Sequence, residues 1–412
     1  MTRNHDEERL VRALHDQAEH VRAHPVAFDD VRASARGIRR RRRVVGGVVG
    51  GVAAVLVAVA LPLGLTAVDG SHPDRPVAPA TSSPSPAPTT APTPRPAPAN
   101  RTVTLTARGA DAGAPASVIY LRDRMVVRPG GAEQAVRASY SSIYPYRGGW
   151  VAVERRDGTP YVVRLDASGN ELNAVPGGDR IAVSVDGVEV AWIESGDPNR
   201  LVLDTSNGHS DAPTIVNLPA GEVTTPVGFL DAGRVVYRVD GARPSSWVAE
   251  AGSKPGRLRD VGNVSAVSGA RGLIAAQTSS SDDGTSCWAV RSVTGSDTGR
   301  VAARSCDWTF QAFSPDGSRL LGAPSDTDGL GASAVAVLDA DTGKPVVTFE
   351  RARTSGAFVG STVWEDDAHL LASLHEDGSW HLLRLGVDGT IEWLDRAAGE
   401  EESSPFAFGA RP

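Results

Sequence analysis

A short motif recurs six times between residues 145 and 373, and it restricts the fold more than any other feature of the chain. In each copy a turn precedes a short apolar strand. The copies are PYRGGWVAV (145–153), SVDGVEVAW (184–192), GFLDAGRVVYRV (228–239), AVSGARGLIAA (266–276), AFSPDGSRLLG (312–322) and VWEDDAHLLAS (363–373). The strands after the turns begin near Trp150, Val188, Val235, Leu273, Leu320 and Leu370, in steps of 38, 47, 38, 47 and 50 residues that average 44.

A step of this size is typical of β-propellers, whose four-stranded blades run about 40–45 residues. The ends of the region carry further strand-like pieces, PFAFGA (405–410) and VTLTA, SVIYL, RMVVR and EQAVR within 102–136. We therefore predict a seven-bladed β-propeller over residues 101–412, with six or eight blades as alternatives. Residues 406–409 should form the innermost strand of a composite last blade and 102–136 its outer strands, because a closed ring leaves no free sheet edge.

Asp-Gly pairs punctuate the predicted strands and suit the positive-φ positions of tight hairpin turns. They lie at 157–158, 186–187, 240–241, 283–284, 316–317, 328–329, 377–378 and 388–389. We interpret these aspartates as turn residues rather than as catalytic acids.

One repeat carries a family resemblance. SPDGSRLL (314–321) is similar to the WD40-like or TolB-type β-propeller repeat. The whole 101–412 region, with the leader before it, resembles the propeller ectodomain of actinobacterial single-pass membrane proteins of unknown function. The resemblance implies a fold and a topology, and it implies no particular activity.

Residues 44–68 form an uncharged, mostly apolar run of 25 residues that follows Arg39 to Arg43. About 20 apolar residues span a bilayer, so we predict a transmembrane helix. The positive-inside rule places residues 1–43 in the cytoplasm and the propeller outside the cell membrane. The alternative is a cleaved signal peptide, although both the run and the segment before it exceed the usual lengths.

The segments that flank the span differ in composition. Residues 1–43 hold 11 Arg and 7 Asp or Glu, so they form a basic cytoplasmic segment, either solvated near anionic lipid or used as a docking helix. Residues 69–100 are rich in Pro, Ser, Thr and Ala and predict an extended linker. Gly46 and Gly50 have the small-residue spacing that lets two membrane helices pair as a homodimer.

The chain has two cysteines, Cys287 and Cys306, and both follow the predicted span. Outside the cytoplasm, disulfides form and persist, so we predict that these residues form one within a single blade. Two buried free thiols are the alternative. Zinc is disfavoured because no histidine lies nearby to complete a site.

Other candidate sites are weak. Asp326 and Asp328 could offer oxygens to calcium, but the remaining ligands of a calcium loop are missing. His369, His375 and His381 recur every six residues and are interpreted as surface residues. Most tryptophans should pack between sheets, with one or two at the channel mouth. We therefore assign no catalytic residue, cofactor or metal.

The formal net charge is −7, and an acidic ectodomain argues against nucleic acid as a partner. The favoured function is a non-catalytic binding, sensing or scaffold module for an envelope protein, a peptide or a glycan. One alternative is an extracytoplasmic glycosidase or lyase that uses the propeller channel. Another is a transmembrane regulator of a cytoplasmic sigma factor.

Overall fold

The computed structural model describes most of the chain after residue 99. The described ranges are 100–205, 213–218, 223–241, 244–280, 286–326, 331–352, 355–399 and 404–409. The predicted cytoplasmic segment, membrane span and nearly all of the linker lie outside them and stay predictions. In the described ranges we find no helix with the length and apolar character needed to cross a membrane.

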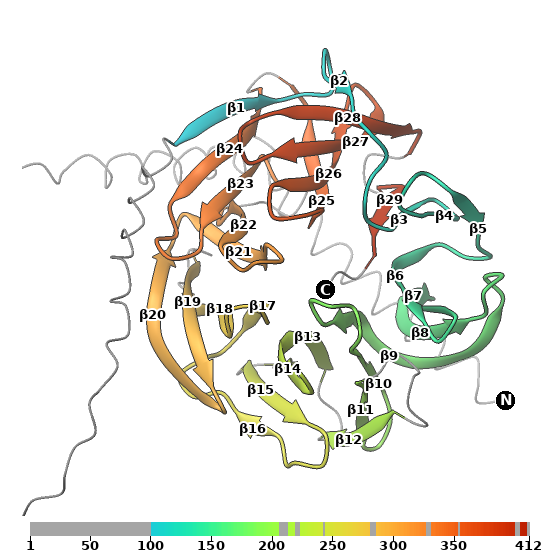
Figure 1. The fold of residues 1–412 in the computed structure, drawn as a ribbon, viewed down its shortest axis with the longest axis vertical. Coiled ribbons are helices and arrows are strands. Elements are labelled where there is room, and N and C mark those ends of the chain that lie inside the picture. Colours follow the sequence, from blue (N-terminus) through green and yellow to red (C-terminus); the bar gives the residue numbers. More distant parts are fainter. Residues whose placement is uncertain are drawn as a thin grey trace, which may run out of the picture. The chain divides into compact units, whose positions relative to one another are not determined.

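Twenty-nine strands form six sheets in the described residues, and Figure 1 shows these sheets set around a common centre. This arrangement confirms the predicted all-β propeller. Two of the sheets contain four antiparallel strands that follow one another along the chain. One comprises β13 (Val223–Asp231), β14 (Arg234–Asp240), β15 (Ser245–Glu250) and β16 (Gly256–Arg257). The other comprises β17 (Val264–Ser268), β18 (Leu273–Ser280), β19 (Ser286–Thr294) and β20 (Asp297–Ser305).

The next two sheets have the same pattern with a fifth strand added at the outer edge. One comprises β21 (Trp308–Phe313), β22 (Arg319–Pro324), β23 (Ala334–Asp339) and β24 (Pro345–Arg351), and β1 (Arg101–Leu105) pairs with β24 in parallel. The other comprises β25 (Phe358–Trp364), β26 (His369–Glu376), β27 (Ser379–Gly386) and β28 (Ile391–Ala397), and β2 (Asp111–Ala112) pairs with β28 in parallel.

The largest sheet has seven strands because one long strand belongs to two groups. The strands are β6 (Tyr140–Tyr146), β7 (Gly149–Arg156), β8 (Thr159–Leu165), β9 (Glu171–Val183), β10 (Val190–Glu194), β11 (Asn199–Asp204) and β12 (Thr214–Leu218). The first half of β9 pairs with β8 and its second half with β10. A Cβ at Gly177 would lie 2.3 Å from the carbonyl oxygen of Ile193, so this close crossing requires glycine.

The sixth sheet joins the two ends of the described chain. Its strands are β29 (Phe406–Phe408), β3 (Tyr120–Arg122), β4 (Met125–Val127) and β5 (Glu133–Ala135), in that order. Phe406 lies opposite Arg122 in an antiparallel register. The expectation that all of 102–136 contributes to this sheet was wrong, since β1 and β2 extend two other sheets instead.

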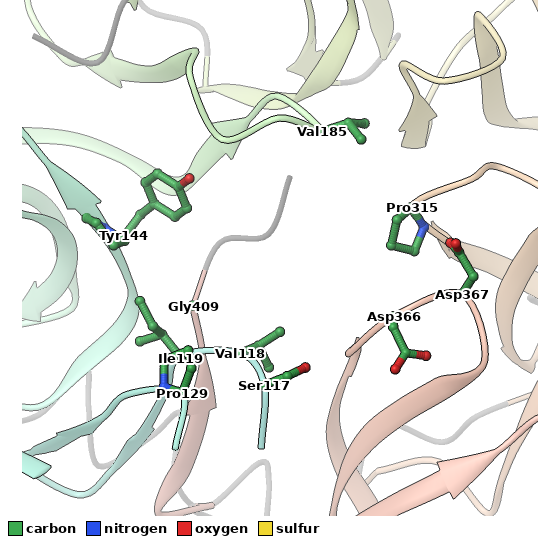
Figure 2. Close-up of a pocket in the computed structure, with 11 residues that line it drawn as sticks. Ser117, Val118, Ile119, Pro129, Tyr144, Val185, Pro315, Asp366, Asp367 and Gly409 are labelled. Atoms are coloured by element: carbon green, nitrogen blue, oxygen red, sulfur yellow. The ribbon is translucent and has the colours of Figure 1, made fainter. Parts of the chain in front are cut away.

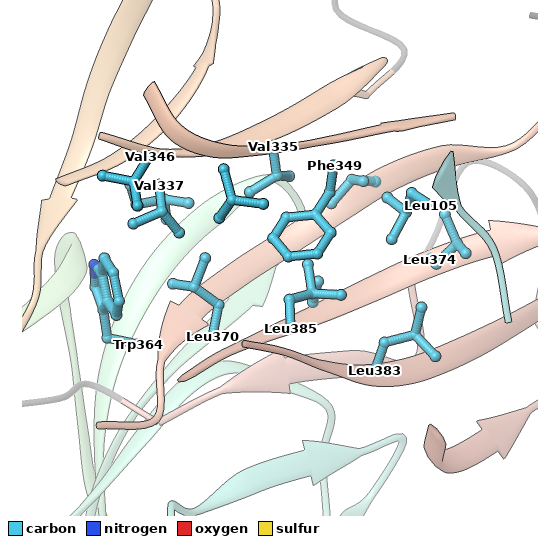
Figure 3. Close-up of a cluster of buried hydrophobic side chains, with 14 of the residues drawn as sticks. Leu105, Val335, Val337, Val346, Phe349, Trp364, Leu370, Leu374, Leu383 and Leu385 are labelled. Carbon is cyan, nitrogen blue, oxygen red and sulfur yellow. The ribbon is translucent and has the colours of Figure 1, made fainter. Parts of the chain in front are cut away.

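The apolar core lies between neighbouring sheets rather than in one central mass. Figure 3 shows one such layer, in which Val335, Val337 and Phe349 of one sheet face Leu370 and Leu385 of the next. All five side chains are 2% exposed or less. Each sheet therefore buries both faces, and this packing fixes the positions of the innermost strands that surround the centre.

Candidate functional site: the central channel and its mouth

Seven strands line a central channel of about 400 Å³. Each of β6, β9, β13, β17, β21, β25 and β29 contributes residues to its wall. These strands are the innermost ones of their four-strand groups, so the channel is a direct product of the fold. A cavity of this size is in the range of small-molecule sites.

A second cavity of about 440 Å³ forms what we call the channel mouth. Its lining residues are Ser117, Val118, Ile119, Pro129, Tyr144, Pro145, Val185, Pro315, Asp366, Asp367 and Gly409. Figure 2 shows Tyr144 and Ile119 on one side of this cavity and Pro315, Asp366 and Asp367 on the other. Val185 is 46% exposed, which is unusual for a valine in this fold. The mouth is therefore mostly apolar, with two carboxylates on one side.

The repeated turns give the mouth a rigid wall. In SVDG the Ser184 hydroxyl donates to Asp186 Oδ1 at 2.6 Å, and Val188 N donates to the same oxygen at 3.0 Å. In SPDG the Ser314 hydroxyl donates to Asp316 Oδ1 at 2.6 Å, and Ser318 N donates to it at 2.9 Å. The same network thus recurs in two sheets and aims the residue between Ser and Asp at the mouth.

These turn carboxylates are held ionised. The hydrogen bond from Ser184 is the main reason why the pKa of Asp186 is lowered. Burial would raise the pKa of Asp316, but hydrogen bonds from Ser314 and Ser318 outweigh it, and the pKa is lowered. A carboxylate with a lowered pKa is a poor proton donor near neutral pH, so both aspartates act as turn residues, as the sequence indicates.

Asp366 and Tyr144 are also fixed by local bonds. Burial opposes ionisation of Asp366, yet the hydrogen bond from His369 and two backbone amides lower its pKa. The Tyr144 hydroxyl donates to the carbonyl oxygen of Gly187 at 3.1 Å, and this bond joins β6 to the turn after β9. Burial raises the pKa of Tyr144, so its hydroxyl stays protonated and keeps this bond.

Charged and polar side chains line the channel itself. Asp179 and Arg180 of β9 and Gln311 of β21 all contribute to its wall. Burial and the positive charge of Arg238 lower the pKa of Arg180, while Asp179 acts in the opposite direction. The channel therefore combines an apolar mouth with an interior that mixes apolar residues with charged and polar ones.

The predicted disulfide is confirmed. Cys287 and Cys306 are bonded, and their Cα atoms lie 4.0 Å apart. Cys287 belongs to β19, and Cys306 directly follows β20, whose Ser305 lies opposite Trp288. The bond thus closes the open end of the hairpin formed by the two outer strands of its sheet, and Cys306 lies two residues before β21 begins at Trp308.

The predicted histidine and calcium features give a mixed result. His369 is partly exposed and bonds Asp366 at 3.0 Å. The surface interpretation of His375 was wrong, because it is 8% exposed and packs on Phe358 and Trp380. Of the two calcium candidates, only Asp326 lies in the described ranges, and these ranges contain no group of three or more His, Cys, Asp or Glu placed for a metal.

Tryptophan packing follows the sequence-based expectation. Trp150, Trp192, Trp288, Trp364 and Trp380 are all buried. Trp364 also lines the channel, where its indole nitrogen donates to the carbonyl oxygen of Ala312 at 3.3 Å.

Val185, Pro315 and Arg180 were not identified from the sequence. The first two occupy the same place in aligned copies of the turn, between Ser and Asp. Comparing that position across repeats is the signal that would have found them. Arg180 has no such signal, because its place in the channel depends on how β9 crosses between strand groups.

The described strands and channel define a β-propeller. No model of a known family matches this sequence, and no curated protein matches it. Among solved structures, the chain is similar to the β-propeller domain of Cps50 (Swd1) from Myceliophteria thermophila, with 10% identity, a TM-score of 0.45, and coverage of 64% of this chain and 88% of that one.

Two further solved structures illustrate the range of similar proteins. Hsv2 from Kluyvelomyces marxianus has 11% identity and a TM-score of 0.43 over 69% of this chain and 99% of that one. A Synechocystis apocarotenoid oxygenase mutant has 12% identity and a TM-score of 0.41 over 64% and 76%. At these identities and scores, none of the three supports an inference about function.

Proposed function

We propose that this chain is a membrane-anchored binding module whose propeller lies outside the cytoplasm and takes a protein or peptide partner at the channel mouth. The uncharged run 44–68 after Arg39 to Arg43 supports the anchor and its orientation. The linker 69–100 would hold the propeller away from the bilayer. The disulfide fits an oxidising compartment.

Seven blades are the count that the strand pairing supports. Each group of four antiparallel strands is one blade, and the seven-stranded sheet then counts as two blades that share β9. The seven innermost strands around the channel agree with this count. The Ser-x-Asp-Gly turns support a WD40-like or TolB-type repeat, in keeping with SPDGSRLL.

The exposed apolar surface at the mouth is the observation that carries the binding function. Val185, which is 46% exposed, and Pro315 both line a cavity of about 440 Å³. Apolar side chains gathered at a cavity commonly mark interaction sites. Asp366 and Asp367 add negative charge at the same cavity. A partner that inserts an apolar side chain next to a basic residue would complement both features.

Capture from envelope extract with the full-length chain tests this proposal. Val185→Ser should lower the yield of the specific partner, and its affinity by roughly tenfold, because burial of one valine contributes about 1.5 kcal/mol. Val188→Ser is the matched control, since Val188 is 41% exposed in the same turn but does not line the mouth. Equal loss in both variants, or no loss in either, would refute the assigned surface.

The topology has its own test. Protease added to intact cells should remove the propeller and leave residues 1–43. A protected C-terminal region would overturn the orientation.

A further inference from the structure

The channel interior is continuous with the mouth but differs from it in chemistry. The two cavities share Val185, Pro315 and Gly409 in their walls. Beyond these residues the channel acquires charged and hydrogen-bonding side chains, among them Arg180 and Gln311. A ligand that enters at the mouth would therefore meet apolar surface first and polar groups afterwards.

Arg180 forms no salt bridge within the described part of the chain, although the neighbouring Asp179 acts on it electrostatically. Its side chain is enclosed by the channel wall yet accessible from within the channel, and it makes neither an ion pair nor a hydrogen bond with another described residue. Other arginines of the propeller are paired: Arg147, just after β6, binds Asp204 at 2.8 Å, and Arg384 in β27 binds Glu392 at 2.7 Å. An unpaired guanidinium inside a cavity is costly unless something else satisfies it.

The surroundings of Arg180 restrict the charge that a ligand can carry. Arg238 lies near enough to lower the pKa of Arg180, but Arg238 is itself bonded to Asp240 at 3.0 Å. Asp179 lies next to Arg180 in β9 and lines the same channel. One free positive charge beside one negative charge suits a monoanion better than a dianion such as phosphate.

Gln311 adds a second polar group to the same cavity. Its side chain is exposed, and it forms no side-chain hydrogen bond within the described ranges. Its amide can donate to an oxygen, as can the guanidinium of Arg180. Guanidinium groups bind carboxylates through two parallel hydrogen bonds, which gives both geometry and affinity.

We propose that Arg180 binds the carboxylate group of a small monoanionic ligand inside the channel, and that Gln311 of β21 offers the ligand a further hydrogen bond from another part of the channel wall. This site is distinct from the partner surface proposed at the mouth, because Arg180 and Gln311 do not line the mouth and Val185 contributes no charge. A channel of about 400 Å³ holds a ligand of this class.

Ligand-observed saturation-transfer NMR with the full-length chain tests the proposal. The probe is N-acetylalanine, N-acetylalaninamide is its uncharged counterpart, and inorganic phosphate is the dianionic competitor. Transfer to N-acetylalanine but not to the amide is expected. Arg180→Gln should weaken binding roughly 10- to 100-fold, as loss of a charged bidentate pair implies. Arg180→Lys should retain part of it.

Arg300→Gln is the matched control, because Arg300 is exposed on the outer strand β20. Arg180→Gln should unfold at or slightly above the wild-type temperature, since the native side chain has no hydrogen-bond partner to lose and its removal relieves an unpaired charge. Pro129→Ser should keep N-acetylalanine binding, because Pro129 lines the mouth but not the channel, and this result separates the two sites. Equal binding by wild type and Arg180→Gln, no binding by wild type, or stronger binding of phosphate would overturn the proposal.

Discussion

Thr106 donates its hydroxyl hydrogen to Glu376 Oε1 over 2.8 Å, although 270 positions separate the two residues in the sequence. The backbone N of Ala107 donates to the other carboxylate oxygen of Glu376, also at 2.8 Å. Glu376 is 8% exposed and ends β26. Its carboxylate therefore holds the segment between β1 and β2 against the β26–β27 hairpin, and this contact fastens the strand pairing of β1 and β2.

Glu376→Gln should destabilise the propeller. Glutamine keeps the size of the side chain but removes its charge and replaces one acceptor oxygen with a donor, so the hydrogen bond with Thr106 must reverse and both bonds lose their charge assistance. We expect the free energy of unfolding to fall by about 1–3 kcal/mol, measured by urea denaturation. Asp377→Asn is the control, because the Arg108–Asp377 pair is exposed and its loss should leave stability unchanged. Equal effects of the two variants would contradict the role given to Glu376.

Replacing both Cys287 and Cys306 with alanine should lower stability by about 3 kcal/mol. The bond closes a loop with a sequence separation of 19, and the chain-entropy model gives that magnitude for such a loop. Denaturation of wild type with and without reductant should show a similar difference, while the double variant should not respond to reductant. If reductant also lowered the stability of the double variant, the effect of reductant on the wild type could not be attributed to the Cys287–Cys306 bond.

Phe406→Ala should be among the most damaging single substitutions. Phe406 is 2% exposed and packs with Tyr120 and Trp380 where β29 joins β3. Removal of a buried phenylalanine typically costs about 3–5 kcal/mol. Phe408→Ala is the matched control, because Phe408 lies on the same strand but is only partly buried. A loss for Phe406→Ala no larger than that for Phe408→Ala would show that β29 contributes little to closing the ring.

Local turn chemistry explains why the repeat could be predicted from sequence. The Ser-x-Asp-Gly networks at Ser184 and Ser314 form among residues at most five positions apart, so each copy determines its own turn. The disulfide was predictable because both cysteines lie in one repeat. The terminal run PFAFGA contains β29, the strand that pairs with β3.

Long-range pairing explains what the sequence could not reveal. The composition of VTLTA would allow it to pair as a strand with any free sheet edge. Its actual partner, the edge of β24, is formed only when the ring assembles. The role of Arg180 likewise depends on which side chains reach the channel. The buried position of His375 depends on Phe358 and Trp380 packing around it.

Two buried glutamates, Glu365 and Glu189, should affect the pH dependence of the free energy of unfolding in opposite directions. Burial opposes ionisation of Glu365, but hydrogen bonds from Arg384 and from Ser117 N outweigh it, and its pKa is lowered. Stability from Glu365 is therefore present above its unfolded pKa, near 4.5, and is lost as pH falls through the folded pKa. Glu365→Gln should lack this loss, so its free energy of unfolding should fall less steeply below about pH 4.5 than that of wild type.

Glu189 should show the reverse behaviour. Burial raises its pKa, partly offset by the hydrogen bond that Gly233 N donates to Oε1 at 2.6 Å. The folded state thus favours the protonated acid, and its contribution is present below the unfolded pKa and lost as pH rises through the folded value. Glu189→Gln keeps an acceptor oxygen for Gly233 but cannot ionise. Relative to wild type it should gain stability between about pH 4 and pH 7.

Glu365→Gln should show no such gain, because a neutral amide in place of the carboxylate would leave Arg384 without its buried charged partner. Urea denaturation of the three proteins across this pH range measures both differences, and parallel curves for wild type and Glu189→Gln would refute the raised pKa.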